Sequence, residues 1–200
     1  ARGAIILAGG RSTRLGGADK PRLEVDGAAL IDTVVAAVST SAPVVVVGPE
    51  DLAGPGIRAV RENPPFGGPV AALAAALPLV PDEVDEVWLL ACDLPRAVDV
   101  VDRLEAVSLA GDVEGVILQD ADGRDQPLAG RYRVRALRRA VEVIGEPSGA
   151  SLRRLLAPLN LLRVVDADGA SVDLDTWEDV AAYRASHPTA TIEDDERIRS

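Results

Sequence analysis

Residues 4–20 read AIILAGGRSTRLGGADK, and this stretch decides the fold because an apolar run leads directly into a long polar loop. The run at residues 4–8 has the length and the unbroken apolar character of a buried β-strand. The loop after it contains four glycines, three cationic residues and two hydroxyls. Glycines let backbone N–H groups close around a polyphosphate, and Arg14 and Lys20 can neutralise its charge. We therefore expect an anion-binding loop at the carboxyl end of a buried strand.

Two well-known phosphate-binding patterns do not fit this loop. It lacks the GxxxxGK[ST] of a P-loop, and it lacks the GxGxxG of a dinucleotide-binding fold. A solvated surface turn is the alternative interpretation. That alternative does not explain why glycines and cations gather directly after a buried strand, where open α/β sheets bind their ligands.

Outward from this loop, short apolar runs alternate with helical patterns along the chain. Strands are predicted at residues 44–47, 57–60, 87–91, 115–118, 127–132 and 161–165, and helices at 28–40, 70–79, 98–108, 134–144, 150–156 and 176–185. This alternation predicts an α/β fold with a largely parallel sheet. We expect one domain over residues 1–187 and a mobile acidic tail over residues 188–200.

The composition limits the partners that the protein can have. The 200 residues are 48% hydrophobic and 26% charged, which is typical of a globular chain. A net charge of −11 disfavours general binding to nucleic acids and to anionic membranes, because both are negatively charged. A single cysteine, Cys92, fits a reducing compartment. No stretch approaches the roughly 20 apolar residues of a membrane span, and the first residues do not form a signal peptide. We expect a soluble, cytoplasmic protein.

Asp93 is a second candidate site residue, because it follows the predicted strand at residues 87–91. A carboxylate at the end of a strand, held by Pro95, is well placed for Mg²⁺, which takes one or two protein carboxylates together with substrate phosphates. The alternative interpretation is that Asp93 caps the helix that begins after Pro95.

Two more carboxylates stand close together in the segment Val172-Asp173-Leu174-Asp175-Thr176. In an extended segment, side chains two residues apart point the same way. Capping of the last helix by Asp175 or Thr176 explains Asp175 well and Asp173 less well. We expect at least one of the two carboxylates to share a cation with Asp93, so that the candidate metal ligands are Asp93, Asp173 and Asp175.

Three other segments have two interpretations each. Residues 62–69, ENPPFGGP, can present backbone amides to a base or a ribose, or can simply form a rigid helix start. Residues 122–127 can bind a second substrate, but physical reasoning favours an ordinary polar turn. The arginines at positions 131, 133, 135, 138 and 139 are expected on a solvated helix face, with binding of an anionic substrate as the alternative.

Taken together, these segments resemble the molybdenum cofactor guanylyltransferase family, within the larger group of sugar-nucleotide-type nucleotidyltransferases. Residues 7–20 are similar to its LAGGxSxRxG signature with the lysine that follows, and Cys92-Asp93-Leu94-Pro95 is similar to its CDxP metal motif. Residues 123–127 resemble its acceptor-side segment. Residues 173–179 resemble its closing stretch, although Asp173 and Asp175 stand where asparagine is common.

The resemblance implies a three-layer αβα sandwich of the Rossmann-like nucleotidyltransferase type (GT-A-like) with a mostly parallel central sheet. The residues that it implies for nucleotide binding are Leu7, Ala8, Gly9, Gly10, Ser12, Lys20, Asn63, Gly68 and Asp93. The residues that it implies for catalysis with Mg²⁺ are Arg14, Lys20 and Asp93. By this resemblance, the phosphate of a molybdopterin-type acceptor would attack the α-phosphorus of GTP and release pyrophosphate.

Two alternatives to this function stay open. A relative with the same first loop would use CTP, or would use a phospho-acid or a sugar phosphate as the acceptor; Gly9 favours the relatives that use GTP. A nucleotide-binding protein without turnover is the other alternative. The presence of Arg14, Lys20 and Asp93 argues against it, because a simple binder has little need of all three.

Overall fold

The apolar run near the start of the chain forms β1 (Arg2–Leu7), an interior strand of a seven-stranded sheet. The computed structural model describes residues 1–9, 20–174 and 176–186, so the predicted tail lies outside the described residues. β4 (Val44–Val47) pairs in parallel with one side of β1, and β6 (Glu86–Ala91) pairs in parallel with the other. Ala4, Ile5 and Ile6 are fully buried, which explains the unbroken apolar run in the sequence.

The strand order is β5-β4-β1-β6-β8-β7-β9. β5 (Ile57–Val60) pairs in parallel with β4, and β9 (Leu161–Val165) in parallel with β7 (Gly115–Gln119). Among the sheet strands of the described residues, β8 (Asp125–Arg133) alone runs antiparallel to both its neighbours. The predicted, mostly parallel sheet is therefore confirmed.

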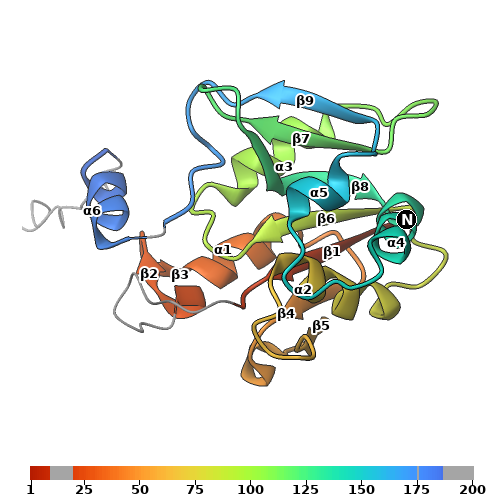
Figure 1. Ribbon diagram of the computed structural model, residues 1–200. Helices are drawn as coiled ribbons and strands as arrows, with labels where there is room; N and C mark the ends of the chain where they lie inside the picture. Colours follow the sequence, from red (N-terminus) through yellow and green to blue (C-terminus); the bar gives the residue numbers. More distant parts are fainter. Residues whose placement is uncertain (10–19, 175, 187–200) are drawn as a thin grey trace, which may run out of the picture.

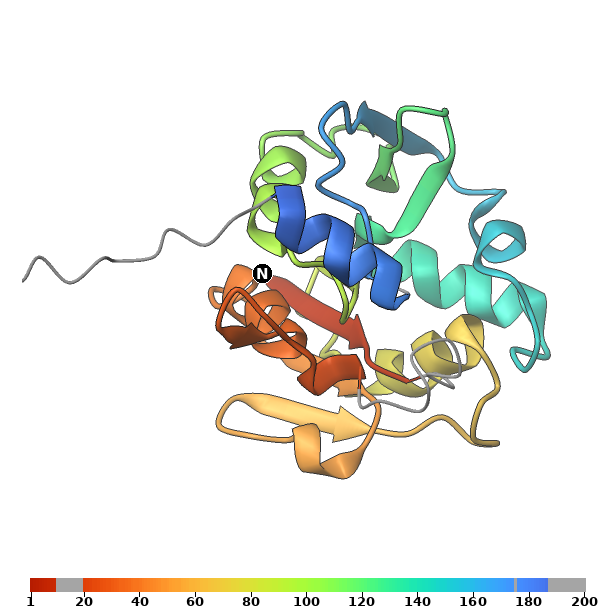
Figure 2. The same cartoon turned by 90° about the vertical axis from the view of Figure 1, so that its left-hand side faces the viewer.

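Helices cover both faces of this sheet (Figures 1 and 2). On one face, α2 (Pro69–Ala76), α4 (Val134–Ile144) and α5 (Leu152–Leu156) pack against apolar side chains of the strands. On the other face, α1 (Leu30–Ala37) and α3 (Ala97–Glu105) pack against a second apolar cluster. These layers confirm the predicted αβα sandwich. Within the described residues, no helix has the length and apolar character needed to cross a membrane.

Each predicted strand and helix is present, but several ends differ. The helix predicted at 28–40 starts later, because Ala28–Ala29 forms strand β3 and pairs with β2 (Glu24–Val25). The turn between β2 and β3 has positive φ angles at Asp26 (54°) and Gly27 (81°), as expected for an Asp-Gly hairpin. The helix predicted at 70–79 changes after Ala76 into the 3₁₀ helix η4 (Leu77–Leu79), which contains a proline.

The last helix, α6 (Trp177–Ser186), lies at the end of the molecule where β1 and β6 finish (Figures 1 and 2). The hydroxyl of Thr176 accepts a hydrogen bond from Asp179 N at 3.1 Å, and the Asp179 carboxylate accepts one from Thr176 N at 2.7 Å. This reciprocal pair starts the helix, as in a capping box. Val180 of α6 and Leu174 pack with Val25 and Leu30 in a small third cluster. The helix is thus attached to the segment that follows Lys20.

Tyr132 of β8 fills a gap that two glycines leave open. Its ring is fully buried, and its hydroxyl donates a hydrogen bond to the carbonyl of Pro127 at 2.8 Å across an irregularity in the pairing of β7 with β8. Burial raises the pKa of this hydroxyl above its usual range. A Cβ atom on Gly115 or Gly130 would lie 2.7 Å from the ring. The tyrosine therefore requires glycine at both positions.

Gly130→Ala is expected to destabilise the protein by about 1–3 kcal/mol, the range for overpacking a core. The added methyl would also lie 2.9 Å from Ile117, so it has nowhere to move. Gly54→Ala is the control, because no atom lies within 4 Å of a Cβ at that position. Thermal denaturation of both variants tests the prediction. Equal melting temperatures would show that the space around Tyr132 is not tightly packed.

Candidate active site

The segments that follow four parallel strands meet at one edge of the sheet. Ala8 N donates to Val47 O at 2.8 Å, and Cys92 N donates to Leu7 O at 3.1 Å. Gly48 N donates to Val60 O at 2.9 Å, which brings the end of β5 to the same edge. Leu7 and Ala8, which were predicted to bind the nucleotide, thus lie between the ends of β4 and β6. This is the edge at which open α/β sheets bind ligands.

Lys20 and Asp93 form an ion pair at this edge, although they are far apart in the sequence. Lys20 begins the short 3₁₀ helix η2 (Lys20–Arg22), and Asp93 lies in the turn after β6. Their side chains are only 16% and 9% exposed. Since an isolated charge is costly at such low exposure, each group stabilises the charge of the other. The structure therefore brings together two of the three residues predicted to act in catalysis.

Helix capping does not explain Asp93. The N-cap position of α3 is occupied by Arg96, and no side chain forms a capping hydrogen bond there. Asp93 is 6% exposed and is one of four buried polar or charged residues among the described ones. The capping alternative is therefore wrong, and the carboxylate is available for a role at the strand ends.

Asp173 lies at the same edge as Asp93. Leu174 N donates a hydrogen bond to Asp93 O at 3.3 Å, so the backbone that carries Asp173 runs alongside the turn that carries Asp93. Capping does not explain Asp173 either, because Thr176 and Asp179 start α6 between them. The backbone at Asp173 therefore lies next to the turn that carries Asp93, as a shared site would require.

The donor set at this edge fits a magnesium ion. Mg²⁺ usually takes one or two protein carboxylates and completes its shell with water and phosphate oxygens. In the described parts of the chain, no three His, Cys, Asp or Glu side chains gather into a site made of protein ligands alone. Asp93 and Asp173 would thus hold the ion together with a phosphate-bearing substrate. Asp175 lies outside the described residues, as do Gly10, Ser12 and Arg14, so their predicted roles stay predictions.

The loop between β5 and α2 also reaches the end of β1. Gly68 precedes α2 with a φ of 89°, a conformation that favours glycine. Asn63 is exposed near the start of the loop. Gly149 N donates to Gly67 O at 2.8 Å, which ties the loop to the segment before α5. The structure thus places Asn63 and Gly68 in one loop beside the strand ends, as the sequence predicts.

Glu62 lies beside Gly9 after the end of β1, and the sequence analysis did not single it out within the segment 62–69. Its carboxylate oxygens lie 3.7 and 3.8 Å from the position of a Cβ atom on Gly9, and Oε1 accepts a hydrogen bond from Phe66 N at 3.1 Å. Glu62 stands two residues after the end of β5, as Asp93 stands two residues after the end of β6. The rule that singled out Asp93, a carboxylate just beyond a strand, would have found Glu62 as well.

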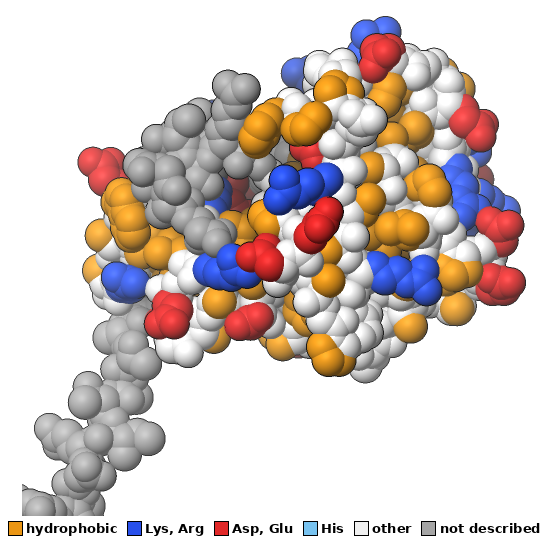
Figure 3. Space-filling view, turned by 90° about the horizontal axis from the view of Figure 1, so that it is seen from below, with side chains coloured by type: hydrophobic (Ala, Val, Ile, Leu, Met, Phe, Trp, Pro, Cys, Tyr) orange, Lys and Arg blue, Asp and Glu red, His pale blue; other side chains and the backbone are white. Residues whose placement is uncertain are grey.

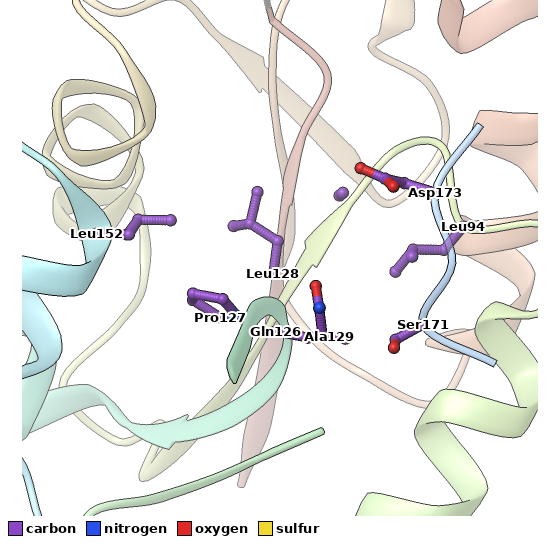
Figure 4. A pocket seen from close by; sticks show the side chains of 9 residues that line it. Leu94, Gln126, Pro127, Leu128, Ala129, Leu152, Ser171 and Asp173 are labelled. Atoms are coloured by element: carbon purple, nitrogen blue, oxygen red, sulfur yellow. The ribbon is translucent and has the colours of Figure 1, made fainter. Parts of the chain in front are cut away.

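A pocket of about 170 Å³ opens beside Asp173 (Figure 4). Figure 4 shows Pro127 and Leu128 of β8 between Leu152 on one side and Leu94 and Asp173 on the other. The volume is below the roughly 300 Å³ at which typical ligand pockets begin, so the pocket can enclose only part of a substrate. Its lining is mainly apolar, and the polar side chains in it are Gln126, Ser171 and Asp173.

The predicted loop at residues 122–127 is both a turn and part of this pocket. Asp120 Oδ1 accepts hydrogen bonds from Asp122 N at 3.0 Å and from Arg124 N at 2.8 Å, which closes the turn. Gln126 and Pro127, at the end of the loop, line the pocket. The polar turn at residues 120–124 is therefore confirmed, and Gln126 and Pro127, the last two residues of the predicted loop, reach the pocket.

The expected solvated face of arginines is wrong for two of them. Arg131 and Arg133 lie in β8 and not in a helix, and Arg131 is 3% exposed. Its guanidinium donates to Glu86 at 2.9 Å and lies 5.6 Å from the ring centre of Trp88. Both arginines pair with the amino end of β6, at the opposite edge from Asp93. They stabilise the sheet and do not face the site.

Charges of both signs are spread over the face seen from below. Figure 3 shows basic side chains spaced among acidic and apolar ones on this face. Elsewhere in the structure, Arg22 and Asp51 form an exposed ion pair of 2.7 Å, and hydrogen bonding to Arg22 lowers the pKa of Asp51. Exposed pairs of this kind contribute little to stability. Lys20 at the strand ends is only 16% exposed, so its charge is less screened and better able to attract a polyphosphate.

Known proteins share this sequence pattern and this fold. Residues 4–166 match the family described as the MobA-like NTP transferase domain. The chain is 36% identical over 141 residues to a probable molybdenum cofactor guanylyltransferase of Synechococcus elongatus, covering 65% of this chain and 71% of that protein.

Two solved structures share the fold at low sequence identity. Molybdopterin-guanine dinucleotide biosynthesis protein A from Archaeoglobus fulgidus has a TM-score of 0.69 at 20% identity, covering 94% of this chain and 98% of that chain. 2-C-methyl-D-erythritol 4-phosphate cytidylyltransferase from Thermus thermophilus has a TM-score of 0.65 at 17% identity, covering 93% and 98%. The match over residues 4–166, together with this fold and the Lys20–Asp93 pair at the strand ends, shows that the chain belongs to the MobA-like NTP transferase family and is a nucleotidyltransferase.

Proposed function

We propose that this nucleotidyltransferase transfers GMP from GTP to the phosphate of a molybdopterin-type acceptor and releases pyrophosphate. The observation that carries the proposal is the ion pair of Lys20 with Asp93, which lies between the end of β1 and the turn after β6. The relative from Synechococcus elongatus, a probable molybdenum cofactor guanylyltransferase, supports the same activity. The single buried cysteine, Cys92, fits a cytoplasmic location.

Lys20 supplies the positive charge for the reaction. Its ammonium group is held at the strand ends by Asp93, so it is already in place when a triphosphate binds beside Leu7–Gly9. There it can donate hydrogen bonds to phosphate oxygens whose negative charge grows as pyrophosphate leaves. Arg14 would add a second cation. Such a reaction depends on positioning and charge stabilisation, and it needs no nucleophile from the protein.

Asp93 and Asp173 would hold Mg²⁺ together with phosphate oxygens of the substrate. The ion, when bound, neutralises phosphate charge and orients the phosphates. Asp93 would contribute its carboxylate from the turn after β6, and Asp173 would contribute its own from the adjacent segment before α6. The acceptor would approach from the pocket beside Asp173, which Gln126 and Pro127 line. The acceptor would then bind next to Asp173, on the β8 side of the proposed metal ligands.

Glu62 supports GTP as the nucleotide. Its carboxylate lies beside Gly9 at the end of β1, where a bound nucleotide would pass. An ionised carboxylate only accepts hydrogen bonds, and guanine presents two adjacent donors, N1–H and the 2-amino group. Cytosine presents one donor on the corresponding edge. The fold alone does not choose between them, because a cytidylyltransferase shares it at a TM-score of 0.65. CTP, or a different phosphorylated acceptor, is therefore the alternative that nucleotide profiling has to test.

We expect purified protein to bind GTP more tightly than CTP, ATP or UTP, and more tightly with Mg²⁺ than without. Asp93→Asn should abolish most of the increase in GTP affinity that Mg²⁺ causes, because the amide removes the anionic ligand.

Lys20→Ala should lower turnover about 10²–10³-fold, the usual loss for a group that stabilises developing charge. Calorimetric titration measures the nucleotide affinities with and without Mg²⁺, and pyrophosphate release measures turnover.

The control for both variants is Asp112→Asn, an exposed carboxylate in the loop before β7, away from the strand ends. An unchanged dependence on Mg²⁺ in Asp93→Asn would place the metal elsewhere. Absence of binding by any NTP to folded wild-type protein would contradict the proposed function.

Glu62→Gln is expected to remove the preference for GTP over ITP, which lacks the 2-amino group of guanine. The wild type should prefer GTP about 10–100-fold, since a hydrogen bond to a charged group contributes roughly 1.5–3 kcal/mol. Glu83→Gln, an exposed residue before β6, is the control and should keep the preference. Competition binding with the two nucleotides measures it. If Glu62→Gln discriminates as well as the wild type, guanine is read elsewhere.

A further inference from the structure

Asp166 is a buried carboxylate that the proposed mechanism does not use. It follows β9 directly and is 2% exposed. Its carboxylate accepts hydrogen bonds from Ala170 N at 2.9 Å, from Ser171 N at 2.7 Å and from Ser171 Oγ at 2.6 Å. Arg103 of α3 donates a further hydrogen bond at 2.7 Å. A buried charge with four donors is well compensated, so the carboxylate shapes the turn at residues 166–171.

Asp168 attaches the same turn to α3, through Arg96 at the start of the helix and Arg103 in its last turn. Its carboxylate accepts hydrogen bonds from Arg96 at 2.9 Å and from Arg103 at 2.7 Å, and its backbone carbonyl accepts one from Arg96 at 2.9 Å. The two arginines hold the pKa of Asp168 well below its usual range. Asp166, Asp168, Arg96 and Arg103 together are called the α3 clasp below.

The α3 clasp joins the two segments that carry the candidate metal ligands. Arg96 stands three residues after Asp93, in the turn that leads from β6 into α3. Asp168 stands five residues before Asp173. The same two segments meet again where Leu174 N donates to Asp93 O at 3.3 Å. Two attachments, one on each side of Asp173, leave this residue little freedom to move relative to Asp93.

The turn that Asp166 shapes also forms a wall of the pocket. Ser171, which donates two hydrogen bonds to Asp166, is 6% exposed and lines the pocket together with Asp173 (Figure 4). Gly169 has a φ of 71°, so the turn reverses within a few residues. A change at Asp166 would therefore reach Asp173 through Ser171 and the short backbone between them.

We propose that Asp166 is a positioning residue for the nucleotidyl transfer, which acts through the α3 clasp by setting Asp173 against Asp93. The inference rests on the proposed function, because it assigns both carboxylates to one divalent cation. Asp166 itself does not touch the substrates. Its carboxylate supplies the acceptors that hold Ala170 and Ser171 in place, and an apolar side chain of similar size would leave their N–H groups without partners.

Asp166→Asn tests the proposal, because it keeps the shape of the side chain and replaces one acceptor oxygen by a donor. The turn should loosen, and the affinity for a divalent cation should fall about tenfold, the lower end of the loss for a direct partner of a metal ligand, because Asp166 acts on Asp173 only through Ser171 and the backbone. The probe is Mn²⁺, whose free ion is counted by electron paramagnetic resonance with the protein in excess over GTP, because unbound GTP would itself chelate Mn²⁺. Binding of GTP without metal should stay within about twofold of the wild type.

Glu114→Gln is the matched control. Glu114 also pairs with an arginine, Arg139, and also accepts a hydrogen bond from a backbone N–H, that of Asn160 at 3.1 Å. It lies just before β7, at the sheet edge opposite Asp93, so its loss should lower the melting temperature without changing the affinity for Mn²⁺. Arg103→Gln is the second test variant, which removes one donor to Asp166 and should weaken Mn²⁺ binding less than Asp166→Asn does.

Failure of this inference can be distinguished from failure of the proposed function. If the wild type binds GTP and Mn²⁺ but Asp166→Asn and Arg103→Gln bind Mn²⁺ as Glu114→Gln does, the α3 clasp only stabilises the fold and the inference is overturned. If the folded wild type binds neither GTP nor Mn²⁺, the proposed function fails and the inference fails with it. A selective loss of Mn²⁺ affinity in the two clasp variants supports it.

Discussion

Parallel pairing of β1 with β4 and β6 is the constraint on which the rest of the structure depends. It requires both faces of β1 to be covered by helices, which is why Ala4–Leu7 contains no polar side chain. It also delivers the ends of neighbouring strands to the same edge. Gly9, Glu62 and Asp93 meet there because each follows a strand of this parallel set.

The antiparallel strand β8 completes the site from the other direction. Because β8 runs against β6, its first residues lie at the edge where β6 ends: Ala129 is opposite Leu90, and Gln126 to Leu128 continue past it. A loop from the second half of the chain thereby reaches the turn that carries Asp93. The same reversal sends Arg131 and Arg133 to the opposite edge, where they pair with Glu86 and backbone carbonyls. The antiparallel direction of β8 thus puts its pocket-lining residues at one edge of the sheet and Arg131 and Arg133 at the other.

The charge at the site is local, which is necessary in a chain with a net charge of −11. Lys20 faces Asp93 with little exposure to solvent, so its attraction for a phosphate is less screened than that of a surface lysine. A small apolar cluster supports both sides of this arrangement. Val25 lies five residues after Lys20, Leu174 directly follows Asp173, and the two pack together with Val180 of α6. The C-terminal helix therefore belongs to the site through packing, although it stands apart from the sheet.

The sequence by itself determined the strands, the helices and the polar loop after β1. A strand buried on both faces is an unbroken apolar run, and a helix buried on one face has apolar residues at a regular spacing, so both are visible locally. It also singled out Asp93 and Asp173 as candidate metal ligands, since a carboxylate beyond a strand or outside a cap is visible locally. The Asp26-Gly27 hairpin was equally visible and was overlooked. Only the tertiary structure decided that Lys20 pairs with Asp93, that Glu62 lies beside Gly9 and that Arg131 is buried. These contacts join residues far apart in the chain, so they depend on the strand order and on the direction of β8. The local spacing of apolar residues determines neither of these.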